Sequence, residues 1–165
     1  MTFLEIKEQL QHRFGHDVIQ AVETNLQPYI IIPVDLLHTC CTFLYRDENM
    51  YFDFLSCITG VDNGPDVGTM EVIYQLYSIP YHHGLMLKVI VQRNQSNEPL
   101  PEVPTISSLW ATANWLEREV YDLFGIVFKD HPDLRRILLP ADWQGYPLRK
   151  DYQQAEQYHG ITVSF

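Results

Sequence analysis

The sequence predicts an α+β domain in which helices pack as a second layer on one mixed five-stranded sheet, followed by an extended C-terminal tail. Three observations lead to this prediction: a helical apolar repeat at the N-terminus, two-residue alternation over two central segments, and a long helical stripe before residue 125. The 165 residues suffice for one domain with a buried core, and 46% apolar and 19% charged residues exclude a disordered chain.

The first part of the chain is expected to supply two helices and three strands. Thr2 and Glu5 form a capping box, and apolar residues then recur at helical spacing as far as Phe14. The expected elements are a helix between Thr2 and Gly15, strands over 18–22, 29–32 and 51–58, and a second helix that begins at Pro33 and turns Leu36, Leu37, Cys40 and Leu44 inward.

Two segments with a period of two residues predict the centre of the sheet. Alternation over 69–78 and 85–92 indicates two strands joined by a hairpin, and their fairly apolar faces favour central positions. Three prolines make 93–104 a loop, and the apolar stripe that follows predicts a long helix with Thr105 as N-cap and Gly125 as C′ residue. The element order is therefore α-β-β-α-β-β-β-α.

Regular patterns end at residue 128, which divides the chain into an α+β domain over 1–128 and an extended segment over 129–165. Proline and glycine interrupt the second part, yet it carries large apolar residues that a solvated tail would lack. A long irregular segment in a compact chain usually serves a function or a partner. We therefore expect 129–165 to bind a partner, with packing on its own sheet as the alternative.

The charge of the chain argues against two classes of partner. With 11 Lys and Arg against 21 Asp and Glu, the net charge of −10 opposes binding to nucleic acid or to anionic lipid. The charge is also uneven, because residues 1–117 carry a net −9 and residues 118–165 only −1. This division favours an acidic domain followed by a segment that meets protein.

Few residues are suited to bind a cofactor, and no segment is suited to anchor the chain in a membrane. Three cysteines, at positions 40, 41 and 57, are too few for a four-cysteine cluster or zinc site and are expected to be buried thiols. His82 and His83 are expected to be exposed in a turn, and the glycines at 60, 64 and 68 to serve a loop between strands. No apolar run reaches the roughly 20 residues of a membrane helix, and no targeting peptide is recognised.

Paired carboxylates lie in the last turns of the predicted long helix. Arg118 and Asp122 have the i,i+4 spacing of an ion pair, and Glu117 and Glu119 flank the arginine. Because an exposed helix face is predicted there, we expect these acids to be solvated or ion-paired. Acid–base catalysis is the alternative.

Cations follow these acids along the chain and allow two roles. Arginine and lysine bind carboxylates by bidentate or point-charge contacts, so the cations can form an internal ion-pair network that pins the tail, or they can address the acidic surface of a partner. Composition leaves both roles open. The residues concerned are His131, Arg135, Arg136, Arg149 and Lys150.

The residues 113–152, ANWLEREVYDLFGIVFKDHPDLRRILLPADWQGYPLRKDY, closely resemble the signature of the C subunit, or 30 kDa-type subunit, of the proton-pumping NADH:quinone oxidoreductase, respiratory complex I. Weaker similarity extends the resemblance to roughly residues 50–152. It implies that the signature residues serve partner binding or structure. These are Glu117, Arg118, Glu119, Asp122, His131, Arg135, Arg136, Arg149, Lys150 and Asp151.

The same resemblance implies a scaffold subunit that supports the quinone-reducing module in electron transfer from NADH to quinone. It implies that this chain binds no cofactor and is not catalytic alone, with FMN and iron–sulfur clusters held by other subunits. The expected partners are the large hydrophilic quinone-site subunit and neighbouring iron–sulfur subunits. The expected location is peripheral, on the cytoplasmic side of the bacterial inner membrane.

The sequence departs from the family pattern at two positions, and two alternative functions stay open. Gln153 stands where many members have proline, and Gly84 begins a stretch where many carry arginine. One alternative is the equivalent subunit of a membrane-bound hydrogenase, formate hydrogenlyase or plastid-type ferredoxin-dependent complex. The other is an autonomous enzyme that uses Glu117, Glu119 and His131. In the favoured case, Arg135→Ala or Arg136→Ala is expected to weaken assembly more than folding.

Overall fold

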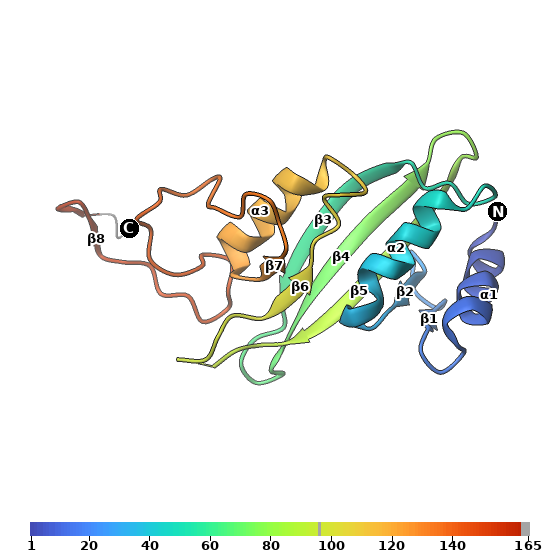
Figure 1. Ribbon diagram of the computed structural model, residues 1–165. Coiled ribbons are helices and arrows are strands. Elements are labelled where there is room, and N and C mark those ends of the chain that lie inside the picture. The colour runs from blue at the N-terminus through green and yellow to red at the C-terminus, as the bar shows by residue number, and fades with distance from the viewer. Residues whose placement is uncertain (96, 163–165) are drawn as a thin grey trace.

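The computed structural model describes residues 1–95 and 97–162, and its main elements follow in the predicted order (Figure 1). They are α1 (Phe3–Phe14), β1 (Gln20–Val22), β2 (Tyr29–Ile31), a 3₁₀ turn η1 (Val34–Leu36), α2 (Leu37–Arg46), β3 (Phe54–Asp62), β4 (Thr69–Ser78), β5 (His83–Gln92) and α3 (Ala113–Phe124). Short strands β6 (Glu102–Pro104), β7 (Val127–Lys129), β8 (Gln157–Tyr158) and β9 (Ile161–Thr162) complete the description.

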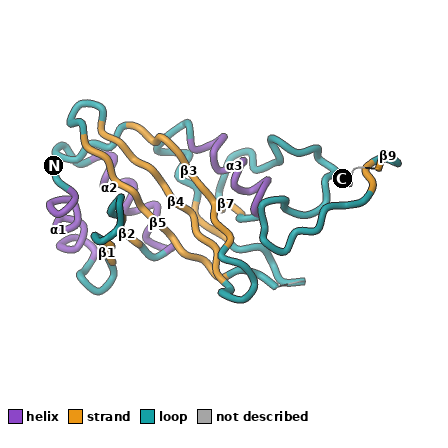
Figure 2. The backbone as a smooth tube through the Cα atoms, turned by 180° about the vertical axis from the view of Figure 1, so that it is seen from behind, coloured by secondary structure: helices purple, strands orange, loops and turns teal. Residues whose placement is uncertain are grey.

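The sheet is mixed, in the order β1-β2-β5-β4-β3, which confirms the predicted fold class. β2 runs parallel to β5, and the other neighbours are antiparallel. Every second residue of β4, from Met70 to Ser78, is buried, and this face lies against the helices. Seen from behind, the strands lie in front of α2 (Figure 2), so the helical layer covers one side of the sheet.

The N-terminal elements form as their sequences predict. Thr2 caps α1, since its hydroxyl accepts the N–H of Glu5 at 3.4 Å while the Glu5 carboxylate accepts the N–H of Thr2 at 2.7 Å. Cys40 and Cys41 are buried on α2. Cys57 is exposed, contrary to prediction, because a register shift between Leu55 and Cys57 in β3 sets its side chain on the uncovered face.

Strand bounds and one histidine differ from the prediction. β1 begins two residues late, and β3 covers 54–62 rather than 51–58 because the chain turns at Tyr51, whose φ is 35°. His82 is exposed, but His83 is buried, since it already belongs to β5 and faces inward. Its Nε2 lies 2.9 Å from the carbonyl oxygen of Met50.

The long helix is shorter than predicted, because it begins at Ala113 and residues 105–112 form turns. β6 pairs in parallel with β7, and the N–H of Thr105 donates to the carbonyl of Lys129 at 3.0 Å. Thr105 therefore ends this ladder and its hydroxyl accepts the N–H of Ser107 at 3.1 Å, while α3 begins eight residues later, with Thr112 at its N-cap position. Gly125 ends α3 in the left-handed conformation, as predicted, with φ 68° and ψ 42°.

Candidate functional site

The signature residues gather around α3, which packs closely on the sheet. The ring of Phe124 lies over Gly60 of β3, where an added Cβ would meet Phe124 Cδ2 at 2.7 Å. Glycine at this position therefore permits the close approach of the C-terminal end of α3 to the sheet. The chain then turns back across this end of the helix with residues 131–151.

Asp122 is a fully buried carboxylate that organises the segment after α3. Its Oδ2 accepts the backbone N–H groups of Ile137, Leu138 and Leu139 at 3.0, 2.8 and 2.9 Å. Burial alone would raise the pKa of Asp122, but the N–H groups and the guanidinium of Arg136 hold it below its usual value. The carboxylate is therefore charged and holds a turn of the following segment.

Arg136 makes the matching cationic contacts. Its Nη1 donates to Asp122 Oδ1 at 2.7 Å and to the Asp122 carbonyl at 3.0 Å. Its Nη2 donates to the carbonyls of Trp143 and Gly145, each at 3.0 Å. One guanidinium thus joins the helix to two later points of the segment.

The predicted ion pair between Arg118 and Asp122 is wrong. Arg118 Nε and Nη2 instead donate to the carbonyls of Arg135 and Arg136, each at 3.1 Å. The i,i+4 spacing places Arg118 near Asp122 along the helix, but the returning segment supplies closer acceptors. Arg118 is accordingly buried, with 8% of its surface exposed.

The C-terminal end of α3 is capped by the same segment. The carbonyl of Leu123 accepts the N–H of Leu148 at 3.0 Å, and Arg149 donates to the carbonyls of Phe124 and Gly125 at 2.6 and 3.2 Å. The Tyr146 ring lies between two cations, 5.0 Å from the Arg149 guanidinium carbon and 5.3 Å from that of Arg136. Positive charge at the C-terminus of a helix is favourable, because the last carbonyls have no helical donors.

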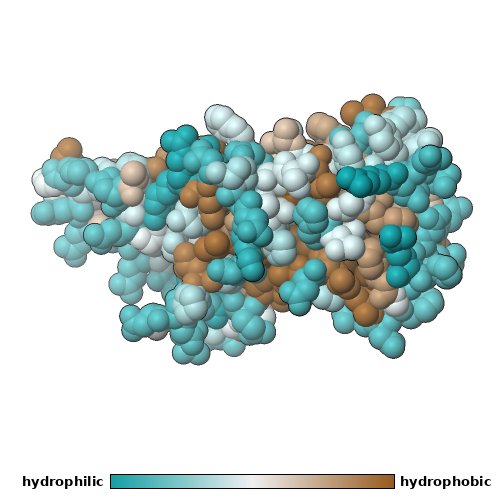
Figure 3. All heavy atoms as spheres, viewed as in Figure 1, coloured by the Kyte–Doolittle hydropathy of each residue, from teal (hydrophilic) through white to brown (hydrophobic). Residues whose placement is uncertain are grey.

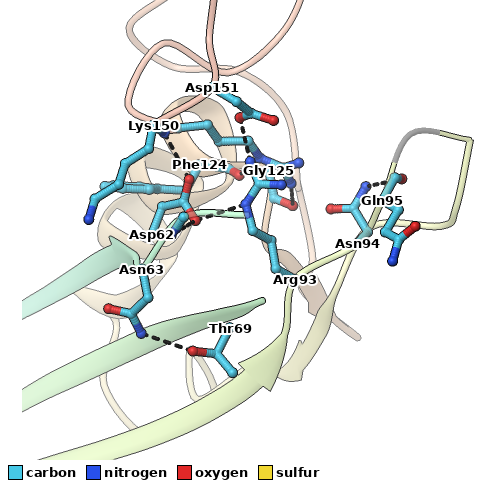
Figure 4. A network of polar contacts seen from close by, with 12 residues as sticks. Asp62, Asn63, Thr69, Arg93, Asn94, Gln95, Phe124, Gly125, Lys150 and Asp151 are labelled. Atoms are coloured by element: carbon cyan, nitrogen blue, oxygen red, sulfur yellow. Dashed lines mark hydrogen bonds and ion pairs between the residues drawn. The ribbon is translucent and has the colours of Figure 1, made fainter. Parts of the chain in front are cut away.

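A second anchor lies at the end of β3, where Asp62 joins three segments (Figure 4). Arg93 Nε donates to Asp62 Oδ1 at 2.9 Å, and the N–H of Lys150 donates to Oδ2 at 2.8 Å. Arg93 Nη2 also pairs with Asp151. Burial alone would raise the pKa of Asp62, but the donors from Lys150, Arg93 and Gly64 lower it.

Glu117 is fully buried, although its predicted place was an exposed helix face. It accepts hydrogen bonds from Thr105 Oγ1 at 2.5 Å and from the N–H of Ile106 at 2.8 Å, which explains why the turns before α3 pack on it. Burial raises its pKa to about 7, although these two donors act in the opposite direction. Desolvation by burial is the main reason why the pKa values of Cys41 and Tyr74 in the same core are raised, and the charge of Glu117 adds to this effect.

His131 belongs to this buried cluster. Its Nε2 lies 3.8 Å from Glu117 Oε2 and 3.0 Å from the carbonyl of Asn114, while its Nδ1 accepts the N–H of Asp133 at 3.0 Å. The side chains of His131 and Glu117 are completely buried. Glu119 is exposed on another side of α3. The three groups suggested for acid–base work therefore do not meet at an accessible point.

The structure sorts the predicted site residues into two groups. Glu119 and Arg135 face solvent, and the side chain of Arg135 is 71% exposed in a pair with Asp133. Lys150 and Asp151 are also exposed, although the Lys150 N–H and the Asp151 carboxylate make internal contacts. The side chains of the other six take part in internal contacts: Glu117, Arg118, Asp122, His131, Arg136 and Arg149.

Asp62 and Arg93, which complete the second anchor, were missed. The sequence places Asp62 in a glycine-containing loop and Arg93 beside a proline-rich one, with no periodicity that relates them to residue 150. Within residues 1–95 and 97–162, no three His, Cys, Asp or Glu side chains are placed to hold a metal ion. None of the helices in the same residues combines the length and apolar character of a membrane span.

Comparisons with known proteins agree on one family. Residues 30–158 match the family described as the 30 kDa subunit of respiratory-chain NADH dehydrogenase. A protein of Chloroherpeton thalassium, named as the C subunit of NADH-quinone oxidoreductase, is 41% identical over 167 residues, which cover 100% of this chain and 65% of that protein. The protein of the same name from Chlorobium phaeobacteroides is 36% identical over 159 residues, 94% of this chain and 92% of that protein.

The fold is shared with a solved structure. A chain in the structure of the membrane-bound sulfane sulfur reductase, an archaeal respiratory membrane complex, aligns with a TM-score of 0.74. The alignment covers 91% of this chain and 85% of that chain at 22% sequence identity. At this identity the similarity establishes the fold alone.

Proposed function

Because the chain belongs to the family of the 30 kDa subunit of respiratory-chain NADH dehydrogenase, we propose that it is a scaffold subunit of an NADH:quinone oxidoreductase. In this role it carries no cofactor and supports the quinone-reducing module, while other subunits hold FMN and iron–sulfur clusters. The complex, and not the isolated chain, transfers electrons from NADH to quinone and translocates protons. The subunit is peripheral and lies on the cytoplasmic side of the bacterial inner membrane.

The observation that carries this proposal is the way residues 131–151 are held. Several of their polar contacts point inward, to Asp122, to the end of α3 and to Asp62. Leu138 and Leu148, by contrast, are 62% and 51% exposed. A segment that is fixed by buried charges and presents apolar side chains is suited to a protein partner, because such side chains gain from leaving water.

The surface of the domain supports the same role. Hydrophobic residues reach the surface at several places on the side drawn in Figure 3. We propose the large hydrophilic quinone-site subunit as the main partner of residues 129–165, with neighbouring iron–sulfur subunits beside it. The signature residues then act indirectly, since they hold the segment in the shape that the partner meets.

A second candidate is the equivalent subunit of a related membrane-bound redox complex. A chain of the sulfane sulfur reductase complex shares the fold, so the fold by itself does not separate the two candidates. Identities of 36% and 41% to subunits of NADH-quinone oxidoreductase favour the first candidate.

Purification of the tagged chain from native membranes in mild detergent tests the proposal. We expect co-purification of the quinone-site and iron–sulfur subunits, identified by mass spectrometry, together with inhibitor-sensitive NADH:quinone activity. A hydrogenase or sulfur-reducing partner would support the second candidate. Recovery of the chain without membrane subunits would contradict both.

A further inference from the structure

An apolar hollow lies at the edge of the sheet, and none of the residues that line it belongs to 129–165. Phe54 and Ser56 of β3 line one side, and Thr112, Trp115 and Leu116 at the start of α3 line the other, around a volume of about 520 Å³. β3 is the outer strand of the sheet, so the hollow opens beside an edge.

Two aromatic side chains of this hollow are exposed to solvent. Trp115 is 65% exposed and Phe54 is 42% exposed. The guanidinium carbon of Arg118, which is itself tied to two carbonyls, lies 5.7 Å from the centroid of the Trp115 ring. Large aromatic side chains, tryptophan above all, are typical of the residues that dominate protein interfaces.

The shape of the edge favours a side chain as the occupant rather than an added strand. The register of β3 shifts between Leu55 and Cys57, so Ser56 lies outside the ladder beside the hollow. Thr112 Oγ1 also donates to the carbonyl of Leu55 at 3.5 Å. Bulges at sheet edges interrupt the row of free backbone groups that strand addition requires.

The negative charge near the hollow limits the kind of partner that can bind there. Glu119 lies one turn of α3 beyond Trp115, is exposed, and has no ion-pair partner within residues 1–95 and 97–162. The chain carries a net charge of −10, which opposes a second copy of itself, a phosphate group or an anionic membrane. A cation beside the hollow would meet the free carboxylate.

We propose that this hollow is a second docking site, which binds a segment of another subunit that places an aromatic or long aliphatic side chain next to a lysine or arginine. The apolar side chain enters between Phe54 and Trp115, and the cation pairs with Glu119. The inference rests on the proposed function, since it requires a partner subunit. It adds an anchor that the C-terminal segment does not provide.

A competition experiment in the native membrane complex tests the site. Wild-type and variant chains with different tags are expressed together, and their ratio in the purified complex is compared with their ratio in the cell. Trp115→Ala is expected to lower relative incorporation at least about tenfold, as removal of an interface tryptophan commonly does. Glu119→Lys is expected to lower it by a similar factor through charge repulsion.

Matched controls separate docking from folding. Val67→Ala changes a side chain that is 64% exposed in a distant loop, and Asp66→Lys makes the same charge change in that loop. Both are expected to incorporate within about twofold of the wild type. All four isolated variants are expected to melt within about 2 °C of the wild type, because each changes an exposed side chain.

Photo-crosslinking identifies the occupant. Phe54→p-benzoylphenylalanine in the assembled complex is expected to capture another subunit at a peptide with an apolar residue adjacent to Lys or Arg. Capture of a second copy, capture of a segment without Lys or Arg, or equal incorporation of Trp115→Ala and Val67→Ala would overturn the inference while leaving the proposed function intact. Absence of the wild-type chain from any membrane complex would overturn both.

Discussion

Arg136 Nη1 lies 2.7 Å from Asp122 Oδ1, while the other oxygen of the same carboxylate accepts the N–H groups of three consecutive residues, 137–139. One buried side chain of α3 therefore holds four donors from the segment that follows the domain. Because these contacts form only when that segment lies against the helix, the conformation of residues 131–151 is coupled to the folding of α3.

Asp122→Asn is expected to destabilise the isolated chain by about 3–5 kcal/mol, since it leaves Arg136 without its counter-charge and sets an amide group among backbone donors. Urea unfolding followed by circular dichroism measures the change. Glu119→Gln is the control, because Glu119 is exposed and should shift stability by no more than about 0.5 kcal/mol. Equal effects of the two changes would show that the Asp122 contacts do not hold the fold.

Arg136→Ala and Arg135→Ala are expected to differ in their effect on stability, although the sequence predicts the same effect for both. Arg136→Ala removes the bonds to Asp122, Trp143 and Gly145 and should cost about 3 kcal/mol or more of unfolding free energy. Arg135→Ala removes an exposed pair with Asp133 worth at most about 1 kcal/mol. Thermal melting of the two variants checks this. A larger loss for Arg135→Ala would contradict the contacts described.

Gly125→Ala is expected to destabilise the chain for two reasons. Gly125 has a φ of 68°, and an added Cβ would lie 2.5 Å from the Tyr146 ring. The left-handed backbone alone costs about 1–2 kcal/mol for alanine, and displacement of the ring adds to this. Gly68→Ala provides the control, because its φ is 71° and the nearest atom is 4.0 Å away. Equal melting temperatures for the two variants would exclude a role for the Tyr146 contact.

Stability is expected to depend on the ionisation of Glu117. Burial raises the pKa of Glu117 in the folded chain to about 7 from its ordinary 4.5, so the folded state binds this proton more tightly than the unfolded state. The resulting stabilisation is complete below pH 4.5 and is lost as the pH rises through 7, a change of about 3 kcal/mol at 1.36 kcal/mol per pKa unit.

The test compares wild type and Glu117→Gln by urea unfolding between pH 5 and pH 8. The variant should lack the decline shown by the wild type in this interval, because its amide cannot ionise. Asp62 and Asp122 have lowered pKa values, and the stability that they provide is lost only as the pH falls below their usual range. Parallel curves for the two proteins would rule out Glu117 as the group responsible.

Asp62→Ala is expected to release the end of the C-terminal segment without unfolding the domain. Asp62 accepts the N–H of Lys150 and pairs with Arg93, so its loss removes the anchor at residue 150. Trypsin should then cleave after Arg149 and Lys150 at a faster rate, as mass spectrometry of timed digests would report. Asp66→Ala, an exposed change in the loop that follows β3, is the control. Unchanged cleavage would show that the other contacts suffice.

Local sequence patterns predicted those parts of the fold that depend on contacts between residues close together in the chain. The capping box of Thr2 and Glu5, the alternation in β4 and the glycine at the end of α3 each act within a few residues, and each was predicted. The start of α3 was not, because Thr105 is held by a parallel ladder to Lys129 and by Glu117. These contacts join residues more than ten positions apart.

The sequence by itself determined the order of the main elements, the mixed sheet, the family of the chain and the identity of its charged signature. Only the tertiary structure decided what these charges do. Glu117 is buried because the turns before α3 pack on it, Asp122 is buried because the segment after α3 returns and covers the helix, and Arg118 binds carbonyls because that return brings them within reach. Helical spacing relates a residue to its own turn, whereas burial and hydrogen-bond partners depend on which distant backbone arrives beside it.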